Sequence, residues 1–526
     1  MTTDGARDGT GDDPFVLVVG AGPTGLLLAA ELARRAVPYR LIDANPGPLH
    51  WDRATVVHPR SLEVFESLGL AERFLAAGTP QRGARLHSGG ELLGAFELSS
   101  SGSSYPFNVG VSEEVTESIL VEYLRTLGGG VTRGTRLVGL TPAHDHVAVE
   151  VEHEGGGYRF DAEWVVGCDG IHSPTRAACG IEMVGHDIDA PWAVFDATLD
   201  GWTDVYDLTL VYLEAVPVIL TALPDRRWRV YLRPSAPDSD LVADATTTLH
   251  RYAPGMSFAA VEHPTRFHCH SKVATSYRSG RVLLAGDAAH LCSPAQGHGM
   301  NTGIQDAENL AWKLALVHQG AAAPELLDSY EAERRPAAAR VADSGDEFEH
   351  AQTLIDPAER AARDEALRTT LADPDARHHE IVAEAELNID YAASPIVSGP
   401  SDPHLGPGAR LPDTIRVRVD GEDGRLHALA RHTGHTVLLL TGPGADAGIS
   451  RPVLEQAREL VTASPRFDSV VAPAPDALDP PSLAALGVDG LTLLAVRPDG
   501  HVGLRADRDH LDALRRYDDL LRTGRR

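Results

Sequence analysis

The sequence predicts an α/β protein with a Rossmann-like dinucleotide-binding domain, an inserted and mostly antiparallel sheet, and a separate C-terminal domain. Residues 15–43 have the order strand, glycine-rich turn, helix and strand, and residues 281–317 have the order strand, glycine-rich loop and helix. Residues 186–275 instead contain short apolar segments separated by Gly, Pro or Asp, which is typical of antiparallel strands. A chain of 526 residues is too long for one hydrophobic core, so two or three domains are expected.

Composition narrows the class of protein. The formal net charge of −28 argues against nucleic acid and against anionic membrane surfaces as partners. Residues 1–13 are polar and acidic, which predicts a disordered leader and no signal peptide. The cysteines have neither CxxC nor metal-ligand spacing, so we expect no metal site and reduced thiols in a cytoplasmic protein. They are Cys168, Cys179, Cys269 and Cys292.

The first glycine-rich turn predicts a dinucleotide site. The turn is Gly20-Ala21-Gly22-Pro23-Thr24-Gly25 and follows the apolar run Phe15–Val19. Gly20 allows the tight turn, Gly22 lets the backbone approach a pyrophosphate, and Gly25 lets the helix pack on the strand. The start of the helix offers unpaired N–H groups to phosphates. Asp43 follows at the distance at which a carboxylate accepts ribose hydroxyls.

Two arginines, Arg53 and Arg60, follow this acid. A planar guanidinium suits an anion, so either arginine could reach the pyrophosphate, and surface ion pairs are the alternative. Pro59 marks a boundary, after which a helix is predicted from Ser61 to about Leu68 with Ser61 as its N-cap.

The middle of the chain predicts a second sheet. Residues 76–110 leave the first domain as short strand-like pieces, and residues 113–127 return as a helix. The predicted strands of the second sheet are Trp192–Leu199, Val205–Leu213, Val216–Leu223 and Trp228–Leu232. Aromatic side chains on sheets usually pack in the core, and lining a substrate pocket is the alternative. The candidates for lining are Tyr206, Tyr212, Trp228 and Tyr231.

The stretch 281–317 predicts a second ligand-binding loop. A strand ends in Gly286-Asp287, a glycine-rich loop follows, and a helix is predicted from about Asn301. The start of that helix directs backbone N–H groups at an electron-rich group, and Asp287 is placed to hold a polyol hydroxyl.

The C-terminal part has its own pattern. Residues 396–412 are rich in Pro and Gly and predict a linker. The remainder, 413–526, has the order strand, helix, strand, helix, hairpin and helix, with Arg497-Pro498-Asp499-Gly500 as the hairpin turn. We expect a self-contained domain that can be removed from about residue 405 onward.

Three motifs occur together in one order: GxGxxG at 20–25, DGxHSxxR at 169–176 and GD…P…GxGxN at 286–301. They resemble the signatures of the class A flavoprotein monooxygenases, the FAD-dependent aromatic hydroxylases built like para-hydroxybenzoate hydroxylase. The resemblance spans residues 15 to about 395. The last domain looks like the thioredoxin-like C-terminal domain of phenol and polyketide hydroxylases. It lacks CxxC, which excludes thiol redox chemistry and leaves packing or a homodimer contact as its role.

The resemblance implies domain limits and site residues. The limits are 14–75, 111–185 and 276–395 for a discontinuous FAD-binding domain, 76–110 and 186–275 for a substrate-binding domain, 396–412 for the linker, and 413–526 for the thioredoxin-like domain. The implied FAD contacts are Gly20, Gly22, Pro23, Thr24 and Gly25 at the pyrophosphate with Arg53 nearby, Asp43 at the ribose, Gly286 and Asp287 at the ribityl chain, and Pro294, Gly297, Gly299, Met300 and Asn301 along the flavin ring. Asp169, with Arg176 nearby, is implied to support both FAD and the nicotinamide donor.

The resemblance also implies an activity. NADPH or NADH reduces FAD, and O₂ then gives a flavin C4a-hydroperoxide that hydroxylates a bulky phenolic substrate, such as an aromatic polyketide. A Baeyer–Villiger monooxygenase acting on a polycyclic ketone is one alternative. A flavoprotein that mainly sequesters an aromatic antibiotic is another. The sequence identifies no catalytic base; His290, His298 and Pro294 are candidates because they flank the flavin loop, with structural roles as the alternative.

Overall fold

The computed structural model describes residues 13–48, 54–202, 204–419, 422–445 and 447–525. Its centre is a five-stranded sheet with the order β19-β20-β11-β1-β2, in which β1 pairs in parallel with β11 and with β2. The strands are β1 (Val16–Val19), β2 (Tyr39–Ile42), β11 (Trp164–Gly167), β19 (Arg278–Ser279) and β20 (Val282–Leu284). The predicted Rossmann-like arrangement is therefore present.

Both faces of this sheet are covered, which explains why β1 is a continuous apolar run. Val16 and Val18 pack in one cluster with residues of three helices, whereas Leu17 and Val19 pack with a three-stranded meander. The helices are α1 (Pro23–Arg34), α4 (Glu113–Thr126) and α7 (His298–His318), and the meander strands are β8 (Arg136–Pro142), β9 (Val147–His153) and β10 (Gly156–Ala162).

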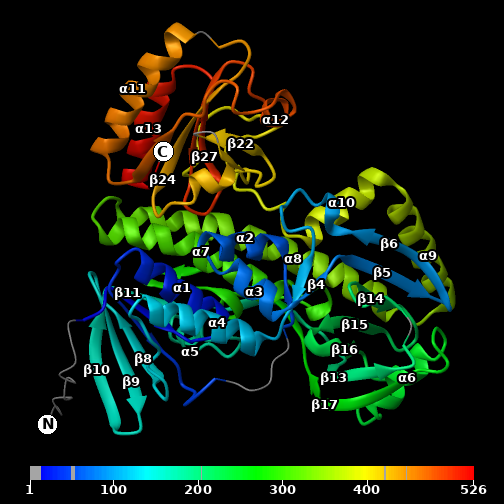
Figure 1. The fold of residues 1–526 in the computed structure, drawn as a ribbon. Coiled ribbons are helices and arrows are strands. Elements are labelled where there is room, and N and C mark those ends of the chain that lie inside the picture. The colour runs from blue at the N-terminus through cyan, green and yellow to red at the C-terminus, as the bar shows by residue number, and fades with distance from the viewer. Residues whose placement is uncertain (1–12, 49–53, 203, 420–421, 446, 526) are drawn as a thin grey trace, which may run out of the picture.

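A seven-stranded sheet with the order β17-β13-β16-β15-β14-β5-β6 forms the second body (Figure 1). The strands are β5 (Gly83–Ser88), β6 (Glu91–Glu97), β13 (Trp192–Asp200), β14 (Thr209–Tyr212), β15 (Val218–Leu223), β16 (Arg227–Leu232) and β17 (Ser257–Phe267). All pairs are antiparallel except β14 with β5, which is parallel. Strands β5 and β6 come from the segment that the sequence placed outside the first domain, and they extend the sheet by two strands.

Two shorter sheets complete the N-terminal two thirds of the described chain. One has the order β3-β7-β4 and the other the order β12-β18-β21. Their strands are β3 (Val56–Val57), β4 (Thr79–Gln81), β7 (Asn108–Gly110), β12 (Met183–Asp187), β18 (His270–Ala274) and β21 (His290–Leu291).

Helices α9 (Pro357–Ala372) and α10 (Pro374–Glu384) lie beside β5 and β6, away from the five-stranded sheet (Figure 1). Leu371 of α9 packs with side chains of the seven-stranded sheet, and Ile381 of α10 packs with Leu98. The assignment of all residues 276–395 to the dinucleotide domain is therefore wrong for this stretch. Charge-rich helices carry few apolar residues, and their spacing does not reveal which sheet they cover.

Two helices begin earlier than predicted. Helix α2 (Pro59–Ser67) begins at Pro59, with His58 rather than Ser61 as its N-cap. Proline at the first helical position needs no hydrogen-bond partner for its nitrogen, so it starts the helix instead of delaying it. Helix α7 begins at His298, directly after Gly297, whose φ of 71° ends the preceding loop.

The C-terminal region forms a four-stranded sheet with the order β25-β24-β26-β27. Its elements are β24 (His435–Thr441), α11 (Ala447–Ala463), β25 (Phe467–Val471), α12 (Pro480–Ala485), β26 (Leu491–Val496), β27 (Val502–Ala506) and α13 (His510–Thr523). From β24 onward this order along the chain is the predicted one, but the preceding hairpin of β22 (Arg416–Val419) and β23 (Glu422–Arg425) was not predicted, and the thioredoxin-like assignment stays a prediction. The predicted linker is bound to this region, because Ser398 bridges Leu504 and Arg410 bridges His501.

The C-terminal region shares a hydrophobic core with the rest of the chain. Trp312 and Leu316 of α7 belong to one buried cluster with Val437, Leu493 and Tyr517 of the C-terminal sheet and helices. In Figure 1 the C-terminal sheet lies directly above α7 and α2. The expectation of a self-contained domain from about residue 405 is therefore wrong, because removal would expose one half of this core.

Buried ion pairs reinforce the same interface. Both Nη atoms of Arg497 donate to Glu333 of α8 (Asp328–Thr353), at 2.7 and 2.8 Å, and Lys313 Nζ donates to Glu333 at 2.8 Å. All three side chains are fully buried. Burial alone would raise the pKa of Glu333, but Arg497 and Lys313 outweigh it and hold that pKa at about 2.

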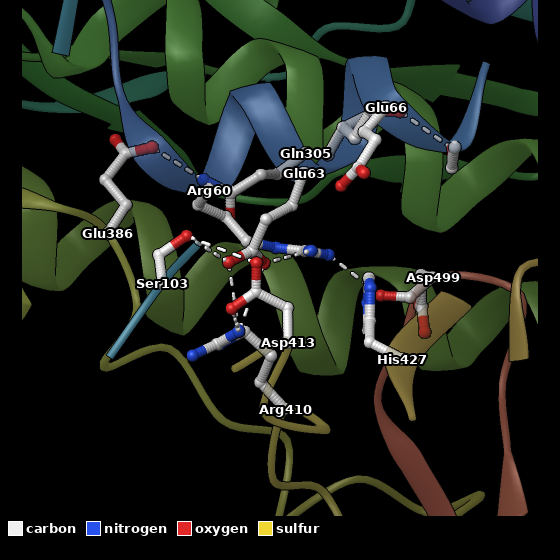
Figure 2. Close-up of polar contacts among 12 residues, drawn as sticks. Arg60, Glu63, Glu66, Ser103, Gln305, Glu386, Arg410, Asp413, His427 and Asp499 are labelled. Atoms are coloured by element: carbon white, nitrogen blue, oxygen red, sulfur yellow. Dashed lines mark hydrogen bonds and ion pairs between the residues drawn. The ribbon is translucent and has the colours of Figure 1, made fainter. Parts of the chain in front are cut away.

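A second group of ion pairs and hydrogen bonds joins α2 to the C-terminal region (Figure 2). Arg410 Nη1 lies 3.0 Å from Glu63 of α2, and Ser103 Oγ donates to the same carboxylate at 2.8 Å. Arg60 of α2 donates to Glu308 of α7 and to the Asp499 carbonyl, each at 2.8 Å. The hairpin turn predicted at 497–500 is therefore also a polar contact with the dinucleotide domain.

Replacing Arg497 should test the importance of this contact. Arg497→Met removes the guanidinium from the buried carboxylates of Glu333, which keeps Lys313, and Asp499, and breaking a buried pair destabilises a protein by about 3–5 kcal/mol. Thermal unfolding followed by circular dichroism should show a large fall in Tm. Arg515→Met is the control, since Arg515 pairs with Asp512 at the surface, where such pairs contribute about 0–1 kcal/mol. Equal Tm values for the two variants would contradict this account.

Candidate functional site

The glycine turn forms an open cradle at the start of α1. A Cβ atom on Gly20, which has φ of 101°, would lie 2.3 Å from the Cys168 carbonyl oxygen, and one on Gly25 would lie 1.9 Å from the Gly20 oxygen. Both positions therefore require glycine for the fold itself. A Cβ on Gly22 would meet nothing closer than Glu117 Oε1 at 4.0 Å. Space for a ligand thus opens at Gly22, where Pro23 and Thr24 also line a cavity.

Asp43, directly after β2, stabilises this glycine turn through hydrogen bonds. Its Oδ2 accepts from the Ala21 N–H at 2.7 Å, and its Oδ1 accepts from the Asn45 N–H at 2.8 Å. Arg133 lies 3.6 Å from the same carboxylate. The carboxylate thus fixes the conformation of the turn, and its contact with a ribose stays a prediction.

Asp169 and Arg176 tie the second motif to the third. Asp169 accepts from the Thr175 N–H at 2.9 Å and from Thr175 Oγ1 at 2.6 Å. Arg176 donates to the Ala288 carbonyl at 2.9 Å and to the Ile171 carbonyl at 2.7 Å. These contacts hold the Asp-Gly turn against the loop that follows β20. Neither side chain lines the cavity, so their roles toward FAD and nicotinamide stay predictions.

The third motif supplies the floor of the cavity. Asp287, Pro294, Gly297, Gly299 and Met300 line it. A Cβ on Gly299 would meet only Cys292 Sγ, at 3.7 Å, so the start of α7 is open toward the cavity. Helix α7 directs its N-terminal N–H groups there, which favours negative charge on a bound group.

Two predicted residues of this region lie behind the loop instead. Asn301 is fully buried; its Nδ2 donates to the Val56 carbonyl and the Gly297 carbonyl, each at 2.9 Å, and its Oδ1 accepts from the His58 N–H. Gly286, with φ of 60°, packs against Thr24 and turns the chain after β20. Neither lines the cavity, because each positions the backbone that does.

The structure gives His290 a structural role, which corrects its candidacy as a catalytic base. Its Nε2 lies 2.6 Å from Asp306 Oδ2, and the ring does not line the cavity. Asp306 also accepts from the Gly286 N–H at 3.0 Å and from Arg334 Nε at 2.7 Å. No sequence motif marks Asp306 or Arg334, although charged residues in apolar helical stretches are a signal of buried pairing.

Arg60 is likewise corrected as a candidate for the pyrophosphate. Its guanidinium is buried against Glu63, Glu308 and the Asp499 carbonyl, at the interface with the C-terminal region. The other candidate, Arg53, lies outside the described residues.

The cavity has a volume of about 650 Å³ and runs from these loops to the seven-stranded sheet. The side chains of its apolar wall are Trp192, Val211, Ile219, Tyr231, Phe267 and Leu371. Tyr231 is therefore the one predicted aromatic that reaches the cavity. Its Oη lies 3.1 Å from Thr55 Oγ1.

The other three aromatic candidates lie on the opposite face of the sheet, which corrects their assignment. Tyr206, Tyr212 and Trp228 pack in a cluster with α6 (Leu241–Leu249). Alternate residues of a strand point to opposite faces, so Trp228 and Tyr231, three positions apart on β16, cannot share a face. The sequence shows this alternation but not which face carries the cavity.

These features fit FAD. FAD is a long dinucleotide that carries a flat ring. The open glycine turn at the start of α1 suits its pyrophosphate, and the open start of α7 with the cavity beside it suits its ring. Residues 14–345 also match the protein family described as "FAD binding domain".

The chain belongs to this family of FAD-dependent aromatic hydroxylases. It is 34% identical to 6-methylpretetramide 4-monooxygenase of Streptomyces rimosus, over 94% of this chain and 91% of that protein. Its fold is similar to the solved structure of OxyS anhydrotetracycline hydroxylase from Streptomyces rimosus, with a TM-score of 0.75, 32% identity and coverage of 96% and 99% of the two chains. Aklavinone-11 hydroxylase, solved with FAD and aklavinone, gives a TM-score of 0.78 at 25% identity, over 98% of this chain and 99% of that one.

The family membership confirms the recognition made from the three motifs, and with it the FAD-dependent monooxygenase activity. FAD is the cofactor, and NAD(P)H is the electron donor typical of the family. Within the described part of the chain, no helix has both the length and the apolar character needed to cross a bilayer.

Filling the glycine cradle should remove FAD without unfolding the protein. Gly22→Val adds a side chain where the fold leaves open space, so the new atoms meet the cofactor rather than the protein. The steric overlap should cost about 1–3 kcal/mol of FAD binding free energy, which corresponds to a fall in FAD affinity of roughly tenfold to a hundredfold. Flavin fluorescence titration of the apoprotein measures it. Gly155→Val, in the turn between β9 and β10, is the control, and an unchanged affinity in Gly22→Val would refute the assigned cradle.

Proposed function

We propose that this enzyme hydroxylates a polycyclic phenol of the aromatic polyketide class, with O₂ as the oxidant and NADPH or NADH as the donor. The observation that supports this most directly is the cavity, which joins the predicted flavin loop to an apolar wall built from several strands and helix α9. An apolar wall of this kind binds fused aromatic rings by burial of apolar surface. The named substrates of the relatives, such as anhydrotetracycline and aklavinone, point to the same class.

Bound FAD would supply electron transfer and oxygen activation. The residues of this chain supply binding, orientation and the exclusion of water. The start of α7, with Gly299 and Met300 in the cavity wall, would stabilise negative charge on the flavin ring. The apolar side chains of β13, β14 and β15 would keep bulk water from the reacting atoms.

Two other functions fit the same fold. A Baeyer–Villiger oxygenation of a polycyclic ketone would use the same cofactor and cavity. A protein that mainly sequesters an aromatic antibiotic would need the cavity but no turnover. Fold alone does not separate these functions.

Anaerobic stopped-flow reduction by NADPH, followed by addition of oxygen and mass analysis of the products, separates them. A panel of polycyclic phenols should accelerate flavin reduction and yield a product heavier by one oxygen atom. The structure of the product distinguishes ring hydroxylation from ring insertion. Tight binding of a phenol without faster reduction or oxygenation would favour sequestration.

A bulky residue in the apolar wall should exclude large substrates. Val211→Trp places an indole in the cavity from β14, and the overlap of about 1–3 kcal/mol should raise KM for a tetracyclic phenol roughly tenfold or more. FAD content should stay at the parent level. Val138→Trp is the control, since Val138 is exposed on β8. Equal KM values in the two variants would show that the substrate binds elsewhere.

A further inference from the structure

Glu384, the last residue of α10, lines the cavity at its junction with the flavin loop. Asn108, Gln296 and Gly297 line the same cavity. The Glu384 side chain is 22% exposed, so most of it is withdrawn from solvent. No sequence motif marks this position, because α10 is a charge-rich helix far from all three motifs.

Two histidines and an amide surround this carboxylate. Its Oε1 lies 4.0 Å from His58 Nδ1, and its Oε2 lies 4.0 Å from His298 Nε2. Asn108 Nδ2 donates to Oε1 at 3.4 Å, and Asn108 Oδ1 lies 3.1 Å from His58 Nδ1. Among the described residues, Nε2 of each histidine is buried and has no hydrogen-bond partner. The cluster is therefore a polar pocket with unused hydrogen-bonding capacity at the cavity wall.

The histidines do not neutralise the carboxylate. Burial lowers the pKa of His58 to about 3 and that of His298 to about 4, so both rings are neutral at physiological pH. Burial also raises the pKa of Glu384 to about 8, with Glu380 on the same helix adding to the effect and Asn108 opposing it. Glu386, whose pKa burial also raises to about 8, is a further titratable group nearby. A carboxyl group in this state gains and loses its proton near neutral pH, which suits acid–base catalysis.

The backbone around Glu384 is held firmly. Glu386 has a φ of 56°, an unfavourable conformation for a residue with a side chain, and it accepts from Gln305 Nε2 of α7 at 2.6 Å (Figure 2). The Arg60 N–H at the start of α2 donates to the Ala385 carbonyl at 3.3 Å. Helices α2 and α7 thus fix the end of α10 at the cavity.

We propose that Glu384 is the catalytic residue that accepts the proton of the substrate's phenolic hydroxyl. The phenol O–H bond breaks, a new O–H bond forms on a Glu384 oxygen, and the electron pair stays on the phenolic oxygen. The ring then carries more electron density at the carbons ortho and para to that oxygen, where hydroxylation occurs. Asn108 orients the carboxylate, and His58 and His298 keep it without a cationic partner. This role rests on the proposed function.

Binding of 2-naphthol to the FAD-loaded enzyme tests the role without turnover. The pKa of a simple phenol is ~10, so this hydroxyl stays mostly protonated up to pH ~9. Below pH 8 Glu384 holds its own proton, and above it the carboxylate offers a charge-assisted hydrogen bond. Affinity should therefore rise about fivefold between pH 6.5 and 9 in the parent, and stay flat in Glu384→Gln. Glu365→Gln, at an exposed position of α9, should behave as the parent does.

Steady-state turnover of a phenol that the enzyme oxygenates gives a second readout. Glu384→Gln should lower kcat/KM by roughly a hundredfold or more and abolish the rise in rate near pH 8. Glu384→Asp should restore a rise with pH. An affinity for 2-naphthol that does not change with pH in the parent, or that changes equally in Glu384→Gln, would overturn the assignment.

The two proposals fail in different ways. Binding of 2-naphthol that depends on pH through Glu384, in an enzyme that oxygenates none of the phenols, would support the proton-accepting site and refute the hydroxylase proposal. Oxygenation at the parent rate by Glu384→Gln would refute the role of Glu384 and leave the hydroxylase proposal standing.

Discussion

The buried carboxylate of Asp306 fixes the geometry on which the cofactor site depends. It accepts hydrogen bonds from the Gly286 N–H at the end of β20 and from Arg334 of α8. It also lies within hydrogen-bonding distance of the His290 ring, which follows the next turn. Burial alone would raise its pKa, but His290 and Arg334 outweigh burial and keep that pKa below its usual range. One ionised group inside α7 therefore holds both the strand end and the returning strand β21. The cavity-lining residues at the start of α7 follow directly after the segment that this anchor holds.

The same helix joins the cofactor site to the C-terminal region. The face of α7 that carries Asp306 holds the loop, and residues farther along it, from Glu308 to Leu316, pack against the C-terminal sheet and its ion pairs. Desolvated charges such as Lys313 and Glu333 are tolerated only because each has partners from another segment. The C-terminal region thus completes the surroundings of the helix that forms the cavity floor, which is a structural role that needs no thiol chemistry.

The five-stranded and the seven-stranded sheet suit different parts of the bound molecules. The five-stranded sheet presents helix starts and glycine turns, which suit phosphates and a reduced flavin ring. The seven-stranded sheet presents one apolar face, which suits fused rings. The cavity lies where they meet, and its polar lining includes Thr209 and Thr221 of the seven-stranded sheet and Glu384 on α10.

The sequence by itself determined the dinucleotide fold, strands β13 to β16 of the seven-stranded sheet and the loops that line the cavity, because each of these depends on local order. Gly20, Gly22 and Gly25 follow a strand directly, and their roles in backbone geometry do not depend on distant residues. Only the tertiary structure decided which face of β16 is the cavity wall, why His290 pairs with Asp306, and where α9 and α10 pack. It also decided that the hairpin at 497–500 is a buried contact and that Glu384 reaches the cavity. These properties depend on pairing between residues far apart in the chain, and residue spacing carries no record of such pairing.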